Sequence, residues 1–237
     1  MFDVIVSKDE QELSIKAFDY FIQIHYKIFG SEHFYIIPGG KTPRIFYSLL
    51  AQKVNNWSNT KFMLSDERLV SKESKHSNYK MIKNDLIDKI KLDQKPSIIN
   101  YSFGDKSKEE TSCILENNIT QYSNPALAIL GLGDDGHTAS LFPGFPKIFN
   151  ETTRAFINVK NRNEPFTRVS LTFPMLMKSN EIMFLISGQK KAHALKMCLE
   201  GNYNPINYPA QYLFKNFTNN ITLFCDENAA SQLGVLI

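Results

Sequence analysis

An imidazole and two carboxylates follow an apolar segment near the middle of the chain. Asp134, Asp135 and His137 lie in or next to the glycine-rich run 131–136, directly after Ala126–Leu130, which we predict to be a buried strand. Histidine titrates near neutral pH and can act as a general base. Ligands bind at the carboxyl ends of strands in open α/β sheets, and glycines let the backbone approach them closely. This run therefore predicts acid–base chemistry.

The sequence disfavours two other interpretations of this run. Its glycines match the G-x-G-x-x-G fingerprint of dinucleotide sites, but Asp134 and Asp135 would repel a pyrophosphate. Glu151, at the distance expected of the ribose ligand, precedes the next predicted strand instead of ending it. A metal site would need more ligands than His137 and these carboxylates, and there is no H-x-x-x-H motif or Cys/His cluster. We expect neither a dinucleotide nor a catalytic metal.

A candidate anion site lies nearer the N-terminus. The run Gly39-Gly40-Lys41-Thr42-Pro43 follows the predicted strand His33–Ile37 and opens a helix, with Thr42 as its N-cap. The glycines expose backbone N–H groups where anions bind. A plain strand–turn–helix connection is the default alternative. Lys41 and Arg44 favour the anion site, because the helix dipole disfavours cations at this end unless an anion is bound.

Two further basic segments could hold the same anion. Lys190 and Lys191 follow the end of the predicted strand Glu181–Ser187, although Lys190 fits a solvated surface lysine equally well. In the predicted strand Val169–Phe173 and the residue before it, alternation places Arg168 on the polar face. A guanidinium there can grip a phosphate with two hydrogen bonds. An exposed strand arginine is the equal alternative.

Asp66 and Arg68 close another predicted strand, Lys61–Ser65. Their position makes them candidates for holding sugar hydroxyls or a developing charge. The alternative is a structural salt bridge between them, and Glu67 fits a structural role. Ser77 and Asn78, just beyond, fit helix caps.

These side chains require a parallel sheet to bring them together. Short apolar segments alternate with helical patterns, which predicts an α/β fold with a mostly parallel sheet flanked by helices. The first helix should begin with a capping box formed by Ser7 and Glu10. No linker divides the chain, so residues 1–237 should form a single domain, with room for a small subdomain around residues 140–170. The predicted strands are Asp3–Val6, His33–Ile37, Lys61–Ser65, Ser97–Tyr101, Ala126–Leu130, Ala155–Val159, Val169–Phe173, Glu181–Ser187 and Ile221–Cys225.

Composition narrows the class of protein. The chain has 237 residues, of which 43% are apolar and 22% charged, as in an ordinary globular protein. Its 27 Lys and Arg against 24 Asp and Glu include no basic run typical of nucleic-acid binding. Cys113, Cys198 and Cys225 are odd in number and widely spaced, which indicates free thiols in a reducing compartment. With no signal-peptide pattern and no membrane-length apolar run, we expect a cytoplasmic protein without membrane contact.

Taken together, the motifs resemble the 6-phosphogluconolactonase family, within the wider glucosamine-6-phosphate deaminase/isomerase group. The run from Asp135 to Pro143, Asp-Gly-His-Thr-Ala-Ser-Leu-Phe-Pro, is the most specific match. The segments come in the family's order across nearly the whole chain. They are Gly39–Pro43, Ser65–Val70, Gly131–Pro143, Arg168–Pro174, Gly188–Ala192 and Tyr208–Ala210.

The resemblance implies a Rossmann-like fold, no metal or organic cofactor, and hydrolysis of 6-phospho-D-glucono-1,5-lactone in the oxidative pentose phosphate pathway. It implies a small sugar phosphate as the ligand, and leaves open a monomer or a homodimer. His137 would be the base, Asp135 would orient its ring, and Arg68 would stabilise charge on the substrate. The implied substrate- and phosphate-binding residues are Gly39, Gly40, Lys41, Thr42, Asp66, Arg168 and Lys191.

Some residues depart from the family pattern, and two other functions remain to be weighed. Lys41 stands where the family often has a small residue, and the loop with His76 and Asn78 is a loose version of the family's loop. A deaminase/isomerase would have an acidic partner shortly after the histidine, but the range 138–150 contains no carboxylate. A non-catalytic sugar-phosphate sensor would normally carry a DNA-binding domain, for which this chain has no room, and would not need His137.

Overall fold

The computed structural model describes residues 2–28, 30–99, 115–117, 119, 122, 124–160 and 165–234. Cys113 and the end of the predicted strand Ser97–Tyr101 lie outside these ranges. The strands of the described chain are β1 (Phe2–Ser7), β2 (His33–Ile37), β3 (Thr60–Leu64), β4 (Asp66–Arg68), β5 (Ser97–Ile98), β6 (Leu127–Gly131), β7 (Phe156–Lys160), β8 (Thr167–Leu171), β9 (Glu181–Ile186) and β10 (Asn220–Asp226). Its helices are α1 (Glu10–Lys27), α2 (Pro43–Lys53), α3 (Asn78–Asp85), α5 (Lys147–Asn150), α6 (Phe173–Leu176), α7 (Ala192–Leu199), α8 (Gln211–Asn216) and α9 (Glu227–Ala230), with 3₁₀ turns η1 (Ile87–Lys89) and η2 (Gln189–Lys191).

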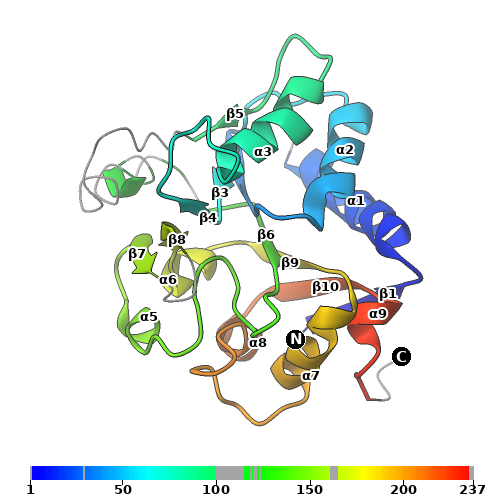
Figure 1. Ribbon diagram of the computed structural model, residues 1–237. Coiled ribbons are helices and arrows are strands. Elements are labelled where there is room, and N and C mark those ends of the chain that lie inside the picture. The colour runs from blue at the N-terminus through cyan, green and yellow to red at the C-terminus, as the bar shows by residue number, and fades with distance from the viewer. Residues whose placement is uncertain are drawn as a thin grey trace.

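The larger sheet has seven strands in the order β1-β10-β9-β6-β2-β3-β5, and neighbouring strands run parallel. Helices α1, α2 and α3 cover one face, and α7, α8 and α9 cover the other (Figure 1). The prediction of an α/β fold with a mostly parallel sheet flanked by helices is therefore confirmed.

The central strands read as continuous apolar runs because helices bury both faces of the sheet. All five residues of β2 are buried, and so are the first four residues of β6. Helix α1 contributes Leu13, Ala17 and Phe21 from one stripe to the core against them. This packing fixes where each strand ends, and so fixes the positions of the loops that follow.

Strands β2 and β6 are neighbours at the point where the strand order reverses. From β2 the chain proceeds outward to β3 and β5, whereas from β6 it proceeds to β9. The loops that follow them, residues 38–42 and 132–137, leave neighbouring strands in chains that continue to opposite sides of the strand order. In doubly wound folds such a switch point opens the crevice where ligands bind.

A second sheet corrects the sequence prediction. The segments predicted as the strands Ala155–Val159 and Val169–Phe173 form β7 and β8, which pair antiparallel in the order β4-β8-β7. Strand β4 was expected only as the end of the strand before it. Ser65 joins the two sheets, since its N–H donates to Ile37 O (2.9 Å) and its carbonyl accepts from Leu171 N (2.9 Å).

Strands β7 and most of β8 lie in the range 140–170, where the sequence left room for a subdomain, but β4 comes from residues 66–68. The alternation of side chains along a short strand does not reveal its partners, so the sequence could not separate the two sheets.

Helix starts were predicted with mixed success. Helix α1 is capped by Asp9, whose carboxylate accepts from Glu12 N, whereas Ser7 ends β1; the predicted capping box of Ser7 and Glu10 is wrong. Thr42 occupies the N-cap position of α2 as predicted, but its side chain makes no capping hydrogen bond. Ser77 does cap α3, accepting from Lys80 N at 3.1 Å. Across the described ranges, no helix combines the length and apolarity that a bilayer crossing requires.

Candidate active site

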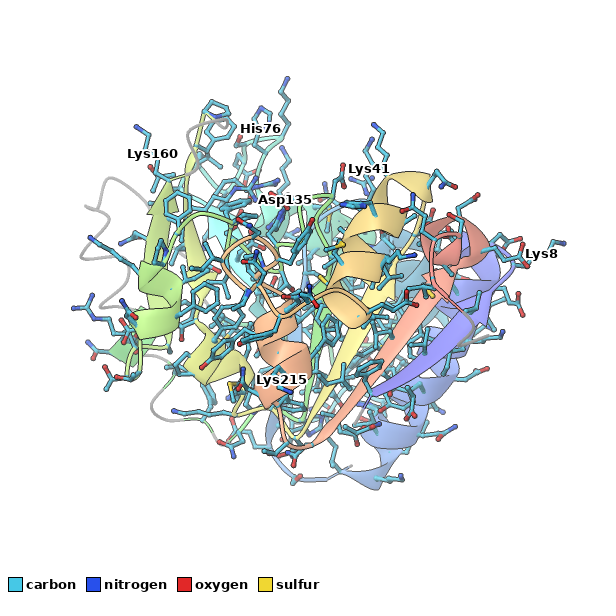
Figure 2. All side chains as sticks on the ribbon, turned by 90° about the horizontal axis from the view of Figure 1, so that it is seen from below. Lys8, Lys41, His76, Asp135, Lys160 and Lys215 are labelled. Atoms are coloured by element: carbon cyan, nitrogen blue, oxygen red, sulfur yellow. The ribbon has the colours of Figure 1, made fainter. Side chains whose placement is uncertain are left out.

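A pocket of about 510 Å³ opens at the carboxyl edge of the larger sheet, over the switch point between β2 and β6. Lys41, His76 and Asp135 lie toward this edge, while Lys215 lies at the opposite one (Figure 2). Ten residues singled out in the sequence line the pocket together: Gly39, Gly40, Lys41, Thr42, Asp66, Arg68, Asp135, His137, Arg168 and Lys191. Parallel strands place their following loops at one edge, so residues 150 positions apart in the chain meet here.

His137 and Asp135 form the central polar pair of the pocket wall. His137 Nδ1 lies 2.5 Å from Asp135 Oδ1, and the same oxygen accepts from the His137 backbone N–H at 3.1 Å. Partial burial raises the pKa of Asp135, but its hydrogen bonds to His137 and the electrostatic interaction with that residue outweigh burial and leave the pKa below its usual value. A carboxylate can only accept here, so Nδ1 carries the proton and Nε2 is the basic nitrogen.

Gly133 is the residue that makes room for this pair. A Cβ atom at Gly133 would lie 2.1 Å from His137 Nδ1 and 2.7 Å from Asp135 Oδ1, far inside van der Waals contact. The Gly133 N–H also donates to the His137 carbonyl at 2.7 Å, closing the turn. The glycine that the sequence assigned to a tight turn is therefore required by the imidazole itself.

Phe142 connects the imidazole to the guanidinium of Arg168. Its ring is buried, with its centroid 4.6 Å from that of His137, and Arg168 Cζ lies 5.4 Å from the same ring. Both contacts restrict the rotamers of the polar groups by packing. In the sequence, Phe142 could be identified only as part of a motif, and this role was not predicted.

Arg168 is buried, so the alternative of an exposed strand arginine is wrong. Only 8% of its surface is exposed, and its Nη1 lies 3.3 Å from Asp66 Oδ2. Ser140 completes the group, because its hydroxyl donates to Asp66 Oδ2 at 2.5 Å and accepts from Arg168 at 3.4 Å. The antiparallel register of β4 and β8 places Asp66 opposite Ser170, which accepts from Ser140 N. The polar face of β8 is thus a buried network.

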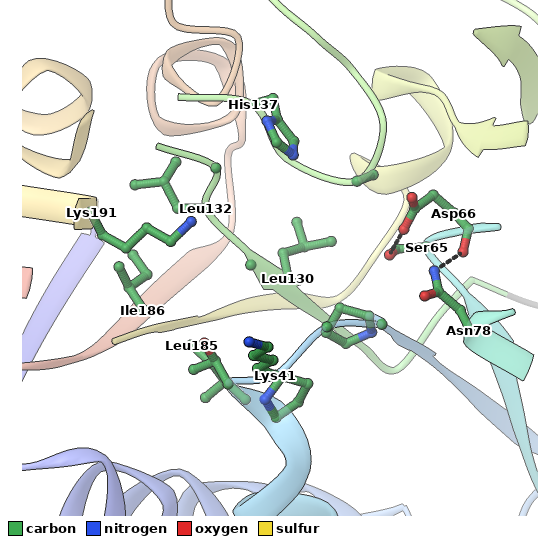
Figure 3. Close-up of a pocket in the computed structure, with 18 of the residues that line it drawn as sticks. Lys41, Ser65, Asp66, Asn78, Leu130, Leu132, His137, Leu185, Ile186 and Lys191 are labelled. Atoms are coloured by element: carbon green, nitrogen blue, oxygen red, sulfur yellow. Dashed lines mark hydrogen bonds between the residues drawn. The ribbon is translucent and has the colours of Figure 1, made fainter. Parts of the chain in front are cut away.

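Arg68 does not pair with Asp66, so the alternative of a structural salt bridge between them is wrong. Its Nη1 instead donates to Asn78 Oδ1 and to the carbonyl of His76, both at 3.0 Å. Asn78 in turn donates to the Asp66 carbonyl at 2.9 Å (Figure 3). A Cβ atom at Gly39 would lie 2.0 Å from Asn78 Oδ1. Asn78 therefore joins the loops after β2 and β3, beyond the cap role expected of it.

Glu67 is structural, as expected, but through hydrogen bonds to the backbone. Its carboxylate is buried and accepts from Asn78 N at 2.8 Å and from Tyr79 N at 2.7 Å, where α3 begins. Burial raises the pKa of Glu67 despite these bonds. Negative charge at a helix N-terminus is favourable, and it fixes α3 beside the pocket.

Lys41 and Lys191 both reach into the pocket, from the loops after β2 and β9 (Figure 3). Lys191 forms an ion pair with Asp134, which lies on the turn after β6. Lys41 is exposed at the surface of the pocket. Lys190 does not line the pocket, in agreement with its interpretation as a solvated lysine.

Asp226 holds the loop that carries Lys191, and this role was not predicted from the sequence. Its buried carboxylate accepts from Ser187 Oγ at 2.6 Å, from Gly188 N at 3.0 Å and from Ala229 N at 2.7 Å. Gly188 has φ of +95°, a conformation that favours glycine. One carboxylate thus caps α9 and secures the turn before Lys191.

The described residues contain no group of three or more His, Cys, Asp or Glu side chains arranged to hold a metal ion. The pocket instead holds one imidazole paired with a carboxylate, together with several cations, two of which contact the further carboxylates Asp66 and Asp134. This set suits proton transfer next to a bound anion.

Comparisons with known proteins find similarity across most of the chain. Residues 8–223 match the family model described as glucosamine-6-phosphate isomerases/6-phosphogluconolactonase. A 6-phosphogluconolactonase from Synechocystis is 31% identical over 186 residues, which cover 75% of each chain.

Solved structures share the fold. That of a 6-phosphogluconolactonase from Thermotoga maritima superposes with a TM-score of 0.81 at 26% identity, over 95% of this chain and all of the other. A monomeric glucosamine-6-phosphate deaminase gives 0.79 at 21% identity, over 97% and 99%, a likeness of fold alone.

Proposed function

Because this chain belongs to the family of glucosamine-6-phosphate isomerases and 6-phosphogluconolactonases, we propose that it is a 6-phosphogluconolactonase, hydrolysing 6-phospho-D-glucono-1,5-lactone to 6-phosphogluconate. The observation that carries the proposal is the His137–Asp135 pair in the wall of a pocket that Arg168 and Lys191 also line. An activated ester needs one base, stabilisation of the oxyanion and a group that holds the phosphate. The pocket offers all three.

The reaction follows from the orientation of the imidazole. With Nδ1–H donated to Asp135, the Nε2 of His137 takes a proton from water as its oxygen attacks the lactone carbonyl carbon. Arg68 stabilises the negative charge on the resulting oxyanion. As that intermediate collapses, the bond from the carbonyl carbon to the ring oxygen breaks. The imidazolium then returns its proton to the ring oxygen, which leaves as a hydroxyl group.

The phosphate is assigned to the basic side of the pocket. Gly40 and Thr42 present the start of α2, and Arg168 and Lys191 add positive charge. Gly39, Lys41 and Asp66 complete the substrate-binding set. The protein is a cytoplasmic enzyme in this proposal, acting as a single domain of residues 1–237 on a small sugar phosphate.

The decisive experiment measures two activities on one preparation. We expect rapid hydrolysis of freshly generated 6-phosphogluconolactone, corrected for its spontaneous hydrolysis, and no ammonia release from glucosamine-6-phosphate. His137→Ala should lower kcat by about 10²–10⁴-fold, the usual effect of losing a general base. His193→Ala, which removes an exposed imidazole outside the pocket lining, is the matched control.

Ammonia release without lactonase activity would assign the chain to the deaminase branch. Binding of the sugar phosphate without either activity would favour a sensor. The deaminase is the weaker candidate because the range 138–150 after the base contains no carboxylate.

A further inference from the structure

Two cations of the pocket contact carboxylates of the same pocket, but the two ion pairs differ in exposure. The side chains of Arg168 and Asp66 are 9% and 8% exposed, so that pair is fixed in the interior. The side chains of Lys191 and Asp134 are 24% and 58% exposed. The second pair can therefore open into water at little cost, since exposed ion pairs contribute little.

Asp134 has no role in orienting the base. Its neighbour Asp135 makes both hydrogen bonds to His137, while Asp134 turns to Lys191 on the opposite side of the glycine turn. Figure 3 shows Lys191 extending toward this turn at Leu132. A negative charge thus lies against the ammonium to which the proposed function assigns the phosphate.

We propose that Asp134 competes internally with phosphate-bearing ligands for Lys191, and so limits how tightly this pocket binds them. The inference rests on the proposed function, which places the phosphate at Lys191. Because Lys191 is in contact with the Asp134 carboxylate, a phosphate group bound to Lys191 would lie beside that carboxylate. The two negative groups would repel each other. The carboxylate must rotate into solvent, so each binding event breaks one ion pair.

This competition would speed release of the product. Hydrolysis leaves a product with the same phosphate and a new carboxylate, and an enzyme gains rate by not holding such a product tightly. Asp134 weakens the grip on substrate and product alike, without touching the proton transfer at His137. Its removal should therefore tighten binding, the opposite of what losing a binding residue does.

The test is Asp134→Asn, which keeps the shape and removes the charge. By calorimetry at fixed ionic strength, the Kd for inorganic phosphate should fall about twofold to fivefold, the range set by an ion pair of this exposure. The Kd for 6-phosphogluconate and the KM for the lactone should fall with it.

Two controls distinguish the effect of breaking the Asp134–Lys191 ion pair on phosphate affinity from the effect of a change in net charge. Asp19→Asn removes an exposed carboxylate of α1 outside the pocket lining, and should leave phosphate affinity unchanged. In a Lys191→Ala background, Asp134→Asn should give no tightening.

Unchanged or weaker phosphate binding by Asp134→Asn would overturn the inference, as would tightening that persists without Lys191. The binding measurement needs no turnover. Absence of lactonase activity would thus reject the proposed function separately from the outcome for Asp134.

Discussion

At the scale of single residues, the site requires a glycine at position 133, which has no side chain. The imidazole of His137 and the carboxylate of Asp135 occupy the space above Gly133, where any Cβ would collide with both. Gly131, two residues earlier, has open space around its Cβ position and no positive φ. Of the two glycines, only Gly133 is required by the space that neighbouring side chains occupy.

Gly133→Ala should separate the imidazole of His137 from the carboxylate of Asp135. We expect kcat to fall by about 10²-fold, since small displacements of reacting groups have effects of this size. Circular dichroism and the melting temperature should show a folded protein. Gly131→Ala is the matched control and should retain most of the activity. Equal loss of activity in both variants would mean that the alanine acts on the turn rather than on the pair.

The sequence predicted the polar residues of the pocket but not the residues that hold them. His137 and Lys191 could be found because unusual residue types follow predicted strands. Ser140, Phe142 and Asp226 are ordinary core or cap residues until the fold brings them to their partners. Their roles are properties of contacts between distant segments, which one sequence does not contain.

At the scale of elements, the small antiparallel sheet buries the polar face of β8, although the alternating sequence of this strand is typical of a strand with one face in solvent. Strand β8 alternates polar and apolar residues, yet Val169, Ser170 and Leu171 are all fully buried. Pairing with β4 sets Asp66 beside Arg168 and removes both from solvent. The alternation of polar and apolar residues was predicted correctly. The burial of the polar face could not be predicted, because it depends on pairing with β4.

Arg168→Ala should therefore lower the free energy of unfolding, in addition to weakening the proposed binding of the sugar phosphate. It leaves the Asp66 carboxylate buried without its counterion, which typically destabilises a protein by about 3–5 kcal/mol. Urea denaturation at neutral pH measures this. Arg44→Ala breaks a contact to Asp85 in which the arginine is 56% exposed, and should cost less than about 1 kcal/mol. Similar losses in the two variants would contradict the assignment of Arg168 to a buried network.

At the scale of the whole molecule, two buried histidines link stability to pH. His25 Nδ1, in α1, lies 2.9 Å from Tyr35 Oη, and His33 Nε2, at the start of β2, lies 3.1 Å from Thr60 Oγ1. Burial lowers the pKa of both His25 and His33 below the usual histidine value of about 6.5. The folded protein thus binds fewer protons than the unfolded chain in mild acid.

Stability should therefore be full above pH 6.5 and fall as the pH drops through 6.5 toward the lowered folded-state values. Each buried histidine contributes a slope of up to about 1.4 kcal/mol per pH unit in that window. Urea denaturation at several pH values measures it. His25→Gln should flatten the dependence, whereas His193→Ala should leave it unchanged. A free energy of unfolding that stays constant from pH 7 to pH 5 would contradict this account.

The position of β10 has a consequence for synthesis on the ribosome. This strand is translated after every other strand described, yet it lies between β1 and β9, pairing Phe2 with Ile221. Until it emerges, the first strand has no partner and β9 is an unprotected edge. Its last residue, Asp226, then secures the loop before Lys191. Vectorial folding therefore completes the side of the pocket that carries Lys191 last. If the proposed phosphate site is correct, a nascent chain lacking β10 should not yet bind phosphate ligands.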